Sequence, residues 1–100
     1  MEHVWTWSGK YFGYFDGEDL WTHDGQHVGK RNGDDIYGSR GQYLGEVMNN
    51  DRLITNKSKT GWTGYSFTPW ARRVGVVPFV DYVGCVIYAG FEDFPTPNAV

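Results

Sequence analysis

The chain of 100 residues is 40% apolar, 18% aromatic and 21% charged, which excludes a disordered chain and fits one small globular domain. Nine basic and twelve acidic residues give a formal net charge of −3, which argues against a nucleic-acid partner. A domain of this size buries its core only with difficulty, so we expect extra burial from closure of a sheet or from association of subunits.

The single cysteine, Cys85, excludes an internal disulfide. Its apolar neighbours Val83, Val86 and Ile87 predict a buried and unreactive thiol, which suits a reducing compartment. The first ten residues, MEHVWTWSGK, lack the basic and the long apolar segments of a secretory signal. We therefore expect a cytoplasmic protein.

A sixteen-residue phrase is repeated three times within residues 4–54, as VWTWSGKYFGYFDGED, LWTHDGQHVGKRNGDD and IYGSRGQYLGEVMNND. Turn-forming residues punctuate it every eight positions, which is typical of short strands joined by tight turns. The predicted turns centre on Gly9, Gly17, Gly25, Gly33, Gly41 and Asn49. Apolar residues fall two apart or straddle a turn, so each phrase predicts two strands. The fold class is therefore all-β, a meander of short antiparallel hairpins.

Alternation along these strands separates aliphatic from aromatic side chains. Val4, Leu20 and Ile36 share one face of the sheet, and the residue after each of them lies on the other face. The aromatic rows comprise Trp5, Trp7, Tyr11, Trp21, Tyr37 and Tyr43. Such rows serve as the second face of a sheet packed on itself, as an interface with a partner, or as a platform for a sugar. All three interpretations remain open.

Three glycines, Gly13, Gly29 and Gly45, occupy equivalent positions inside predicted strands. Glycine weakens a strand, so its repetition indicates a packing reason. Either an aromatic ring lies across each glycine, or neighbouring backbones converge there.

The period breaks after residue 54. Residues 55–73 read as an irregular loop and one strand, and residues 74–94 as apolar strands that form a possible degenerate fourth unit. The valine-rich part of this region predicts two buried strands broken at Pro78. Asp81, Pro78 and three glycines argue against a membrane span there. Residues 95–100 are expected to form an extended tail.

The phrase DGQHVGKRNGDDIY, residues 24–37, with its counterparts on either side resembles the bacterial 4-fold beta flower proteins, a family of hairpin-repeat proteins of unknown function. The resemblance covers about the first half of the chain, and WG-type and MORN repeats share part of the same vocabulary. It implies four β-units about a pseudo-fourfold axis, in a closed flower-like or barrel-like arrangement. Only three regular units are visible, so the second half of the chain or a partner must supply the fourth. The resemblance implies no activity.

The best metal-ligand candidates are His23 and His27, which flank one predicted turn, with His3 as a third. Equivalent positions in the other repeats hold aromatic residues or serine, so cross-strand packing is the stronger interpretation. The acids at the predicted turn ends are interpreted as solvated turn residues rather than as a calcium site or catalytic carboxylates. They are Glu18, Asp19, Asp34, Asp35 and Asp51. No catalytic motif stands out, and we expect no enzyme and no cofactor.

The sequence favours a non-enzymatic scaffold that presents a protein-interaction surface. The alternative is a module that binds a small ligand or glycan on the aromatic rows. We expect self-association into a homo-oligomer, with a further unknown protein as a possible partner, and neither nucleic acid nor membrane. The apolar residues 74–87 are expected to be buried, either within the monomer or at a homodimer interface.

Overall fold

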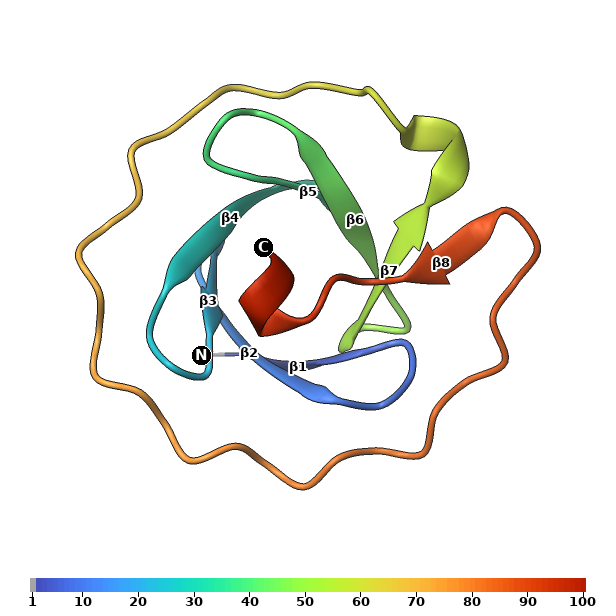
Figure 1. Ribbon diagram of the computed structural model, residues 1–100, viewed down its shortest axis with the longest axis horizontal. Helices are drawn as coiled ribbons and strands as arrows, with labels where there is room; N and C mark the ends of the chain where they lie inside the picture. The colour runs from blue at the N-terminus through green and yellow to red at the C-terminus, as the bar shows by residue number, and fades with distance from the viewer. Residues whose placement is uncertain (1) are drawn as a thin grey trace.

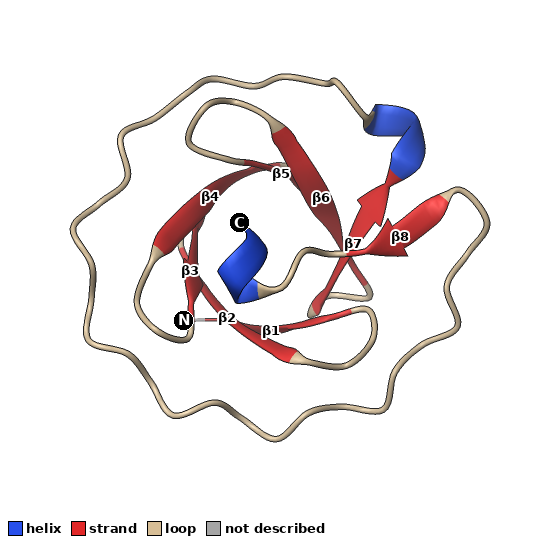
Figure 2. Ribbon diagram, viewed as in Figure 1, coloured by secondary structure: helices blue, strands red, loops and turns tan. Residues whose placement is uncertain are grey.

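The computed structural model describes residues 2–100, and it is a sheet of eight strands arranged in chain order (Figure 1). The strands are β1 (Glu2–Thr6), β2 (Tyr11–Asp16), β3 (Asp19–Thr22), β4 (His27–Asn32), β5 (Asp35–Tyr37), β6 (Tyr43–Met48), β7 (Arg52–Asn56) and β8 (Phe91–Asp93). Two short 3-10 helices, η1 (Lys57–Lys59) and η2 (Pro97–Ala99), are the helical elements of these residues (Figure 2). The predicted all-β fold is confirmed.

Neighbouring strands in this order pair antiparallel throughout. The turns between them lie where the glycine period predicts. The backbone has positive φ at Gly9, Gly17, Gly25, Gly33, Gly41, Asn49 and Asn50. Tight hairpin turns require this conformation, which glycine and asparagine adopt at the least cost.

The sheet closes through a parallel pairing of β1 with β7, in which Trp5 lies opposite Arg52 and Thr6 opposite Leu53. β1 to β7 thus form a closed barrel, which removes the exposed edges of the meander. The remaining part of β7, from Ile54 to Asn56, pairs antiparallel with β8. The pair β7 and β8 is therefore a fourth hairpin, and its connection is the long segment between the two strands.

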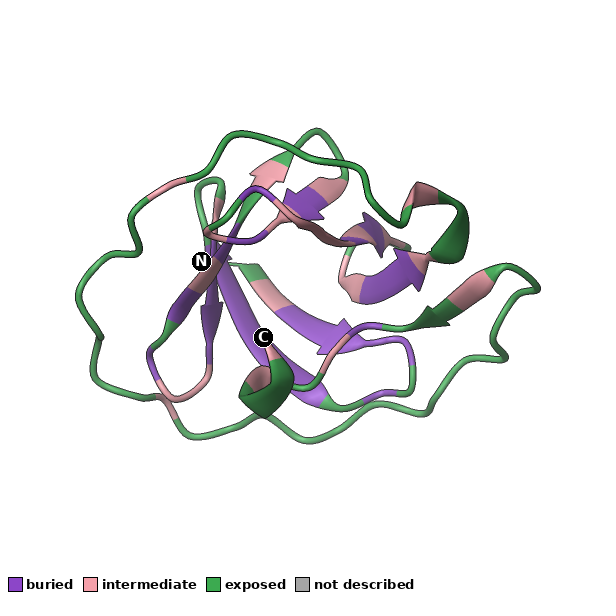
Figure 3. Ribbon diagram, turned by 45° about the horizontal axis from the view of Figure 1, so that its top comes forward, coloured by how far each residue is buried: buried purple, intermediate pink, exposed green. Residues whose placement is uncertain are grey.

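The core lies inside the barrel, where the first residues of the repeats meet (Figure 3). Its buried members are Val4, Phe12, Phe15, Leu20, Ile36, Val47, Leu53 and Phe94. Phe94 follows β8 and packs edge-on against Phe12, with ring centroids 5.3 Å apart. Val100 also packs against this core, so the prediction of an extended tail at 95–100 is wrong. The C-terminal residues fold back over the barrel through η2, which has no buried residue of its own and leads to Val100, the partly buried residue on the core.

The strand glycines mark close approaches between neighbouring strands. A Cβ at Gly29 would meet Cγ2 of Ile36 at 3.0 Å and the carbonyl oxygen of Tyr37 at 3.3 Å. A Cβ at Gly13 would collide with the backbone of Trp21 and Thr22. Convergence of backbones therefore explains Gly13, and the side chain of Ile36 contributes at Gly29. At Gly45 both predicted reasons apply, because a Cβ there would collide with the carbonyl of Ile54 and with the ring of Phe94.

Residues 62–88, which we call the belt, run around the outside of the barrel in Figure 1 without forming a strand. The predicted strands within residues 74–87 are wrong, and so is their burial within the monomer, since Val74, Val77 and Val80 are exposed. The reason is that β1 and β7 already close the barrel and β8 takes the remaining part of β7. The segment therefore pairs with neither closing strand, and Pro78 has no N–H to donate to a strand.

Candidate protein-interaction surface

From Gly64 onward the belt follows three consecutive nine-residue units, GYSFTPWAR (64–72), RVGVVPFVD (73–81) and YVGCVIYAG (82–90), the last of which extends two residues beyond it. The seventh residue of each unit is aromatic, as Trp70, Phe79 and Tyr88. The third residue is small, and the second and fifth are mostly valine. The sequence analysis missed this period, although alignment of the segment with itself at a spacing of nine reveals it.

Each unit of the belt binds the turn of one barrel hairpin through the same two hydrogen bonds. The first residue of a unit donates its N–H to the carbonyl of the turn glycine, and the fourth residue donates to the carbonyl two positions before that glycine. The pairs are Gly64 to Gly41 (2.7 Å), Phe67 to Ser39 (2.9 Å), Arg73 to Gly25 (2.8 Å), Val76 to His23 (2.7 Å), Tyr82 to Gly9 (2.8 Å) and Cys85 to Trp7 (3.0 Å). Successive nine-residue units of the belt therefore bind successive sixteen-residue repeats of the barrel, from the third repeat back to the first.

The belt has a three-residue period within each unit. Its inward N–H groups lie three residues apart, at the first and fourth position of each unit, and its most exposed side chains recur with the same spacing. Val74, Val77, Val80, Val83 and Val86 are 85–91% exposed. Three residues per turn is the repeat of the polyproline II helix, whose backbone makes no internal hydrogen bonds and is free to bond elsewhere.

The belt covers the aromatic rows of β1 and β2. The ring of Trp5 stacks on Tyr82 with centroids 3.8 Å apart, and its Nε1–H donates to the carbonyl of Val80 at 3.0 Å. Trp7 donates from Nε1 to the carbonyl of Val86 at 2.9 Å. These two rings are buried, so they bind the chain itself and form no open platform.

The remaining aromatic rows meet the belt in a similar way. Tyr11 stacks on Phe79 with centroids 5.2 Å apart, and its burial raises the pKa of its hydroxyl. The guanidinium of Arg73 lies 3.8 Å from the ring centre of Trp21, which is within the range of a cation–π contact. Tyr37 and Tyr43 are half-buried on the third hairpin. The belt therefore packs on the predicted aromatic rows.

The three histidines have separate partners. Nδ1 of His27 accepts the N–H of Trp70 at 3.0 Å, and its Nε2 lies 3.0 Å from Oδ1 of Asp19. Nδ1 of His3 bonds the hydroxyl of Tyr11 at 2.8 Å. Within residues 2–100, no cluster of three or more histidine, cysteine, aspartate or glutamate side chains is placed to hold a metal ion.

The turn acids divide into two kinds. Asp34 is largely exposed, as the sequence predicts. Asp19 and Asp35 are mostly buried, because Asp19 faces His27 and Asp35 accepts from the ammonium of Lys59 at 2.8 Å. For these two residues the interpretation as solvated acids is wrong, and their partners are structural.

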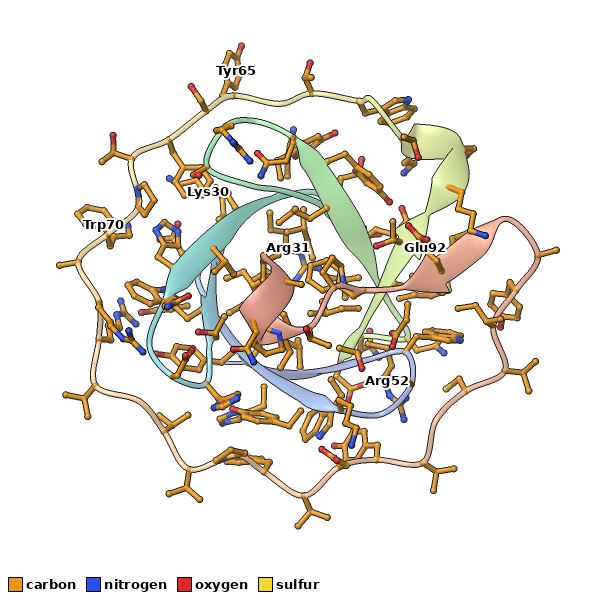
Figure 4. All side chains as sticks on the ribbon, viewed as in Figure 1. Lys30, Arg31, Arg52, Tyr65, Trp70 and Glu92 are labelled. Carbon is orange, nitrogen blue, oxygen red and sulfur yellow. The ribbon has the colours of Figure 1, made fainter. Side chains whose placement is uncertain are left out.

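The outward surface of the belt is apolar over most of its length. Many of its side chains point away from the barrel in Figure 4, Tyr65 among them. Cys85 is exposed as well, so the prediction of a buried thiol is wrong. Arg52 of β7 holds the belt from the barrel side, because it donates to the carbonyl of Val83 at 2.9 Å. This outward surface is the candidate interaction site.

Comparison of the chain with models of protein families, with curated proteins and with solved structures finds no match. The likeness to 4-fold beta flower proteins therefore rests on the repeat motif alone. Over residues 2–100, no helix is long and apolar enough to cross a membrane.

Proposed function

We propose that the protein is a non-enzymatic scaffold that acts through the outward surface of its belt, and that a second copy of the chain is the partner bound there. The observation that carries this proposal is the row of exposed valines at three-residue spacing, of which Val74, Val77 and Val80 form the proposed contact. Soluble monomers rarely expose apolar patches larger than a few hundred Å² unless the patch binds something.

The apolar row is continuous along the belt. At about 3.1 Å per residue, successive valines in an extended chain lie roughly 9 Å apart. The half-exposed rings of Phe79 and Tyr82 lie between them. Burial of such a row contributes about 25 cal/mol for each Å² removed from water, which favours association over a solvated surface.

Two charges flank the part of the row formed by Val74, Val77 and Val80, and they make it complementary to a second copy. Arg72 precedes the row with a side chain that is 62% exposed, and Asp81 follows Val80 with one that is 49% exposed. In an antiparallel contact centred on Val77, Val74 of one copy faces Val80 of the other. The basic end of each copy then meets the acidic end of its partner, as a two-fold symmetric interface requires.

Light scattering at micromolar concentration tests the apolar part of this proposal. The wild-type chain is expected to be a dimer, and the variant V74S/V77S/V80S a monomer with an unchanged circular dichroism spectrum. V83S/V86S is the matched control, because it removes equally exposed valines outside the proposed contact and is expected to remain dimeric. A monomeric wild-type chain, or an unchanged triple variant, contradicts the proposal.

A charge exchange tests the geometry of the contact. R72E and D81R are each expected to weaken the dimer, and the double variant R72E/D81R to restore it. Within one chain, Arg72 contacts Asp24 and Asp81 contacts Lys10, so the double variant breaks both internal pairs. Recovery of the dimer in the double variant can therefore come only from pairing between copies, and its absence contradicts the antiparallel arrangement.

The alternative, a sugar on the aromatic rows, is disfavoured by the position of the belt. Trp5, Trp7 and Tyr11 are at most 5% exposed. A ligand would have to displace the belt, with its hydrogen bonds, before it reached these rings.

A further inference from the structure

A second feature of the surface lies away from the valine row, between the second and third hairpins. It is a cleft of about 420 Å³, bounded on its outer side by Pro69 and Trp70 of the belt. Small-molecule sites commonly have volumes of this order, with an apolar wall and a few convergent polar groups. Val28 and Leu44 supply further apolar lining.

The indole of Trp70 is an open wall of this cleft. Its side chain is 64% exposed, whereas Trp5, Trp7 and Trp21 are buried beneath the belt. Its backbone is nevertheless fixed, because its N–H donates to Nδ1 of the buried His27 at 3.0 Å. The backbone of Trp70 is therefore held in place while its ring stays available for a ligand.

Two guanidinium groups give the cleft its charge. Arg40 and Arg72 both line it, and among the described residues Arg40 makes no ion pair. Arg72 is positioned by Asp24, whose backbone carbonyl accepts from its Nε at 3.2 Å and whose carboxylate pairs with its Nη2 at 3.4 Å, so only part of its hydrogen-bonding capacity is used and Arg40 is the unpaired cation among the described residues that line the cleft. None of the residues that line the cleft within residues 2–100 is an aspartate or a glutamate. The cleft therefore favours an anion.

Two side-chain amides complete the set of polar groups. Gln26 and Gln42 line the cleft together with Ser39. The Oε1 atom of Gln42 accepts the N–H of Arg40 at 3.0 Å, which orients the amide and leaves its nitrogen free to donate. Amides that offer both donors and acceptors suit neighbouring hydroxyl groups.

We infer that this cleft is a binding site for an acidic saccharide, with one sugar ring against Trp70 and its carboxylate on Arg40 and Arg72. The glutamine amides then bind ring hydroxyls. An exposed indole with flanking amides and guanidinium groups provides the apolar, hydroxyl-binding and carboxylate-binding contacts that such a ligand needs. The cleft shares Arg72 with the proposed dimer contact, whereas Trp70, Arg40 and the glutamines lie outside that contact.

Titration of the full chain with trigalacturonate, followed by ¹H–¹⁵N NMR, tests the inference. We expect saturable shifts of the Trp70 indole and the Arg40 guanidinium, and none with a neutral trisaccharide. R40Q and R72Q are each expected to weaken binding roughly tenfold, as loss of a hydrogen bond to a charged group implies. W70A is expected to weaken binding at least as much.

W62A is the matched control, because Trp62 is a half-exposed tryptophan of the same belt that lies outside the cleft, and it is expected to bind with unchanged affinity. Equal binding of the neutral trisaccharide overturns the assignment of an acidic ligand. Tighter binding of a mononucleotide overturns the saccharide class. If roughly 10 mM trigalacturonate, about ten times a weak dissociation constant of 1 mM, causes no shifts, the site itself is overturned.

Discussion

The backbone N–H of Trp70 donates to Nδ1 of His27 at 3.0 Å, which joins the belt to the inside of the second hairpin. This contact fixes the protonation of the imidazole. Nδ1 must be unprotonated to accept, so the proton is on Nε2, which faces Asp19 at 3.0 Å. A fully protonated imidazole has no acceptor left for Trp70.

The stability of the protein is expected to fall as the pH is lowered through the range of His27. Burial lowers the pKa of His27 below the ordinary value of 6.5, and Asp19 opposes this effect. The unfolded chain therefore takes up a proton at a higher pH than the folded chain, so this contribution to stability is complete above about pH 6.5 and decreases below it. Thermal unfolding between about pH 7.5 and 5.5 measures the effect.

The variant H27N is expected to flatten this pH dependence, because asparagine keeps an acceptor but does not titrate. H23N is the control, since the backbone of His23, not its side chain, binds the belt through the N–H of Val76. It is expected to retain the pH dependence of the wild-type chain. An H27N profile that parallels the wild type contradicts the assigned role of His27.

Lys59 is expected to stabilise the packing of η1 on the third hairpin. Its ammonium lies 2.8 Å from both Asp35 and Glu46, and all three side chains are mostly buried. Hydrogen bonds to these carboxylates raise the pKa of Lys59. K59M is expected to cost about 1–3 kcal/mol in the free energy of unfolding, because two carboxylates lose their partner. K57M, at a neighbouring exposed lysine, is the control in urea unfolding, and equal stability of the two variants contradicts the prediction.

The turn glycines test how much the belt contributes to stability. Gly25 and Gly17 both have positive φ, so alanine strains either turn by about 1 kcal/mol. A Cβ at Gly25 would also collide with the carbonyl of Arg73, whereas a Cβ at Gly17 meets nothing within 4 Å. G25A is therefore expected to lose more stability than G17A and to become sensitive to trypsin at Arg72 and Arg73. Equal losses of stability in the two variants, together with equal rates of cleavage by trypsin, contradict the contact between the belt and this turn.

Much of the barrel could be predicted from the sequence because its determinants are local. Glycine and asparagine mark the turns, and alternation places Val4 inside and Trp5 outside. The belt could not be predicted in this way, because valines spaced three apart resemble a buried strand until the free edges of the sheet are known. That information is non-local. It depends on the pairing of Trp5 with Arg52, which lie far apart in the sequence.

The sequence pointed to residues 74–87 as a monomer core or a homodimer interface and to the aromatic rows as a binding surface, but it did not show that this segment covers the rows. Their positions on one face follow from strand alternation, but what covers them depends on contacts such as that of Trp5 with Tyr82. The cleft at Trp70 depends on the same long-range packing. The sequence analysis missed the nine-residue period of the belt. This period is the signal in the sequence that corresponds to the repeated contacts of the belt with the hairpin turns.

The most direct test of the hydrogen bonds between the belt and the barrel is amide hydrogen exchange, measured for each residue by NMR. The amides of Phe67, Val76 and Cys85 donate to barrel carbonyls, and they are expected to exchange slowly. The amides of Thr68, Val77 and Val86, one position later, make no such bond in the described chain and are expected to exchange at rates close to those of an unstructured peptide. Protection at the first and fourth residues of each nine-residue unit supports the account. Uniformly fast exchange across residues 62–88, with the barrel strands still protected, would contradict it.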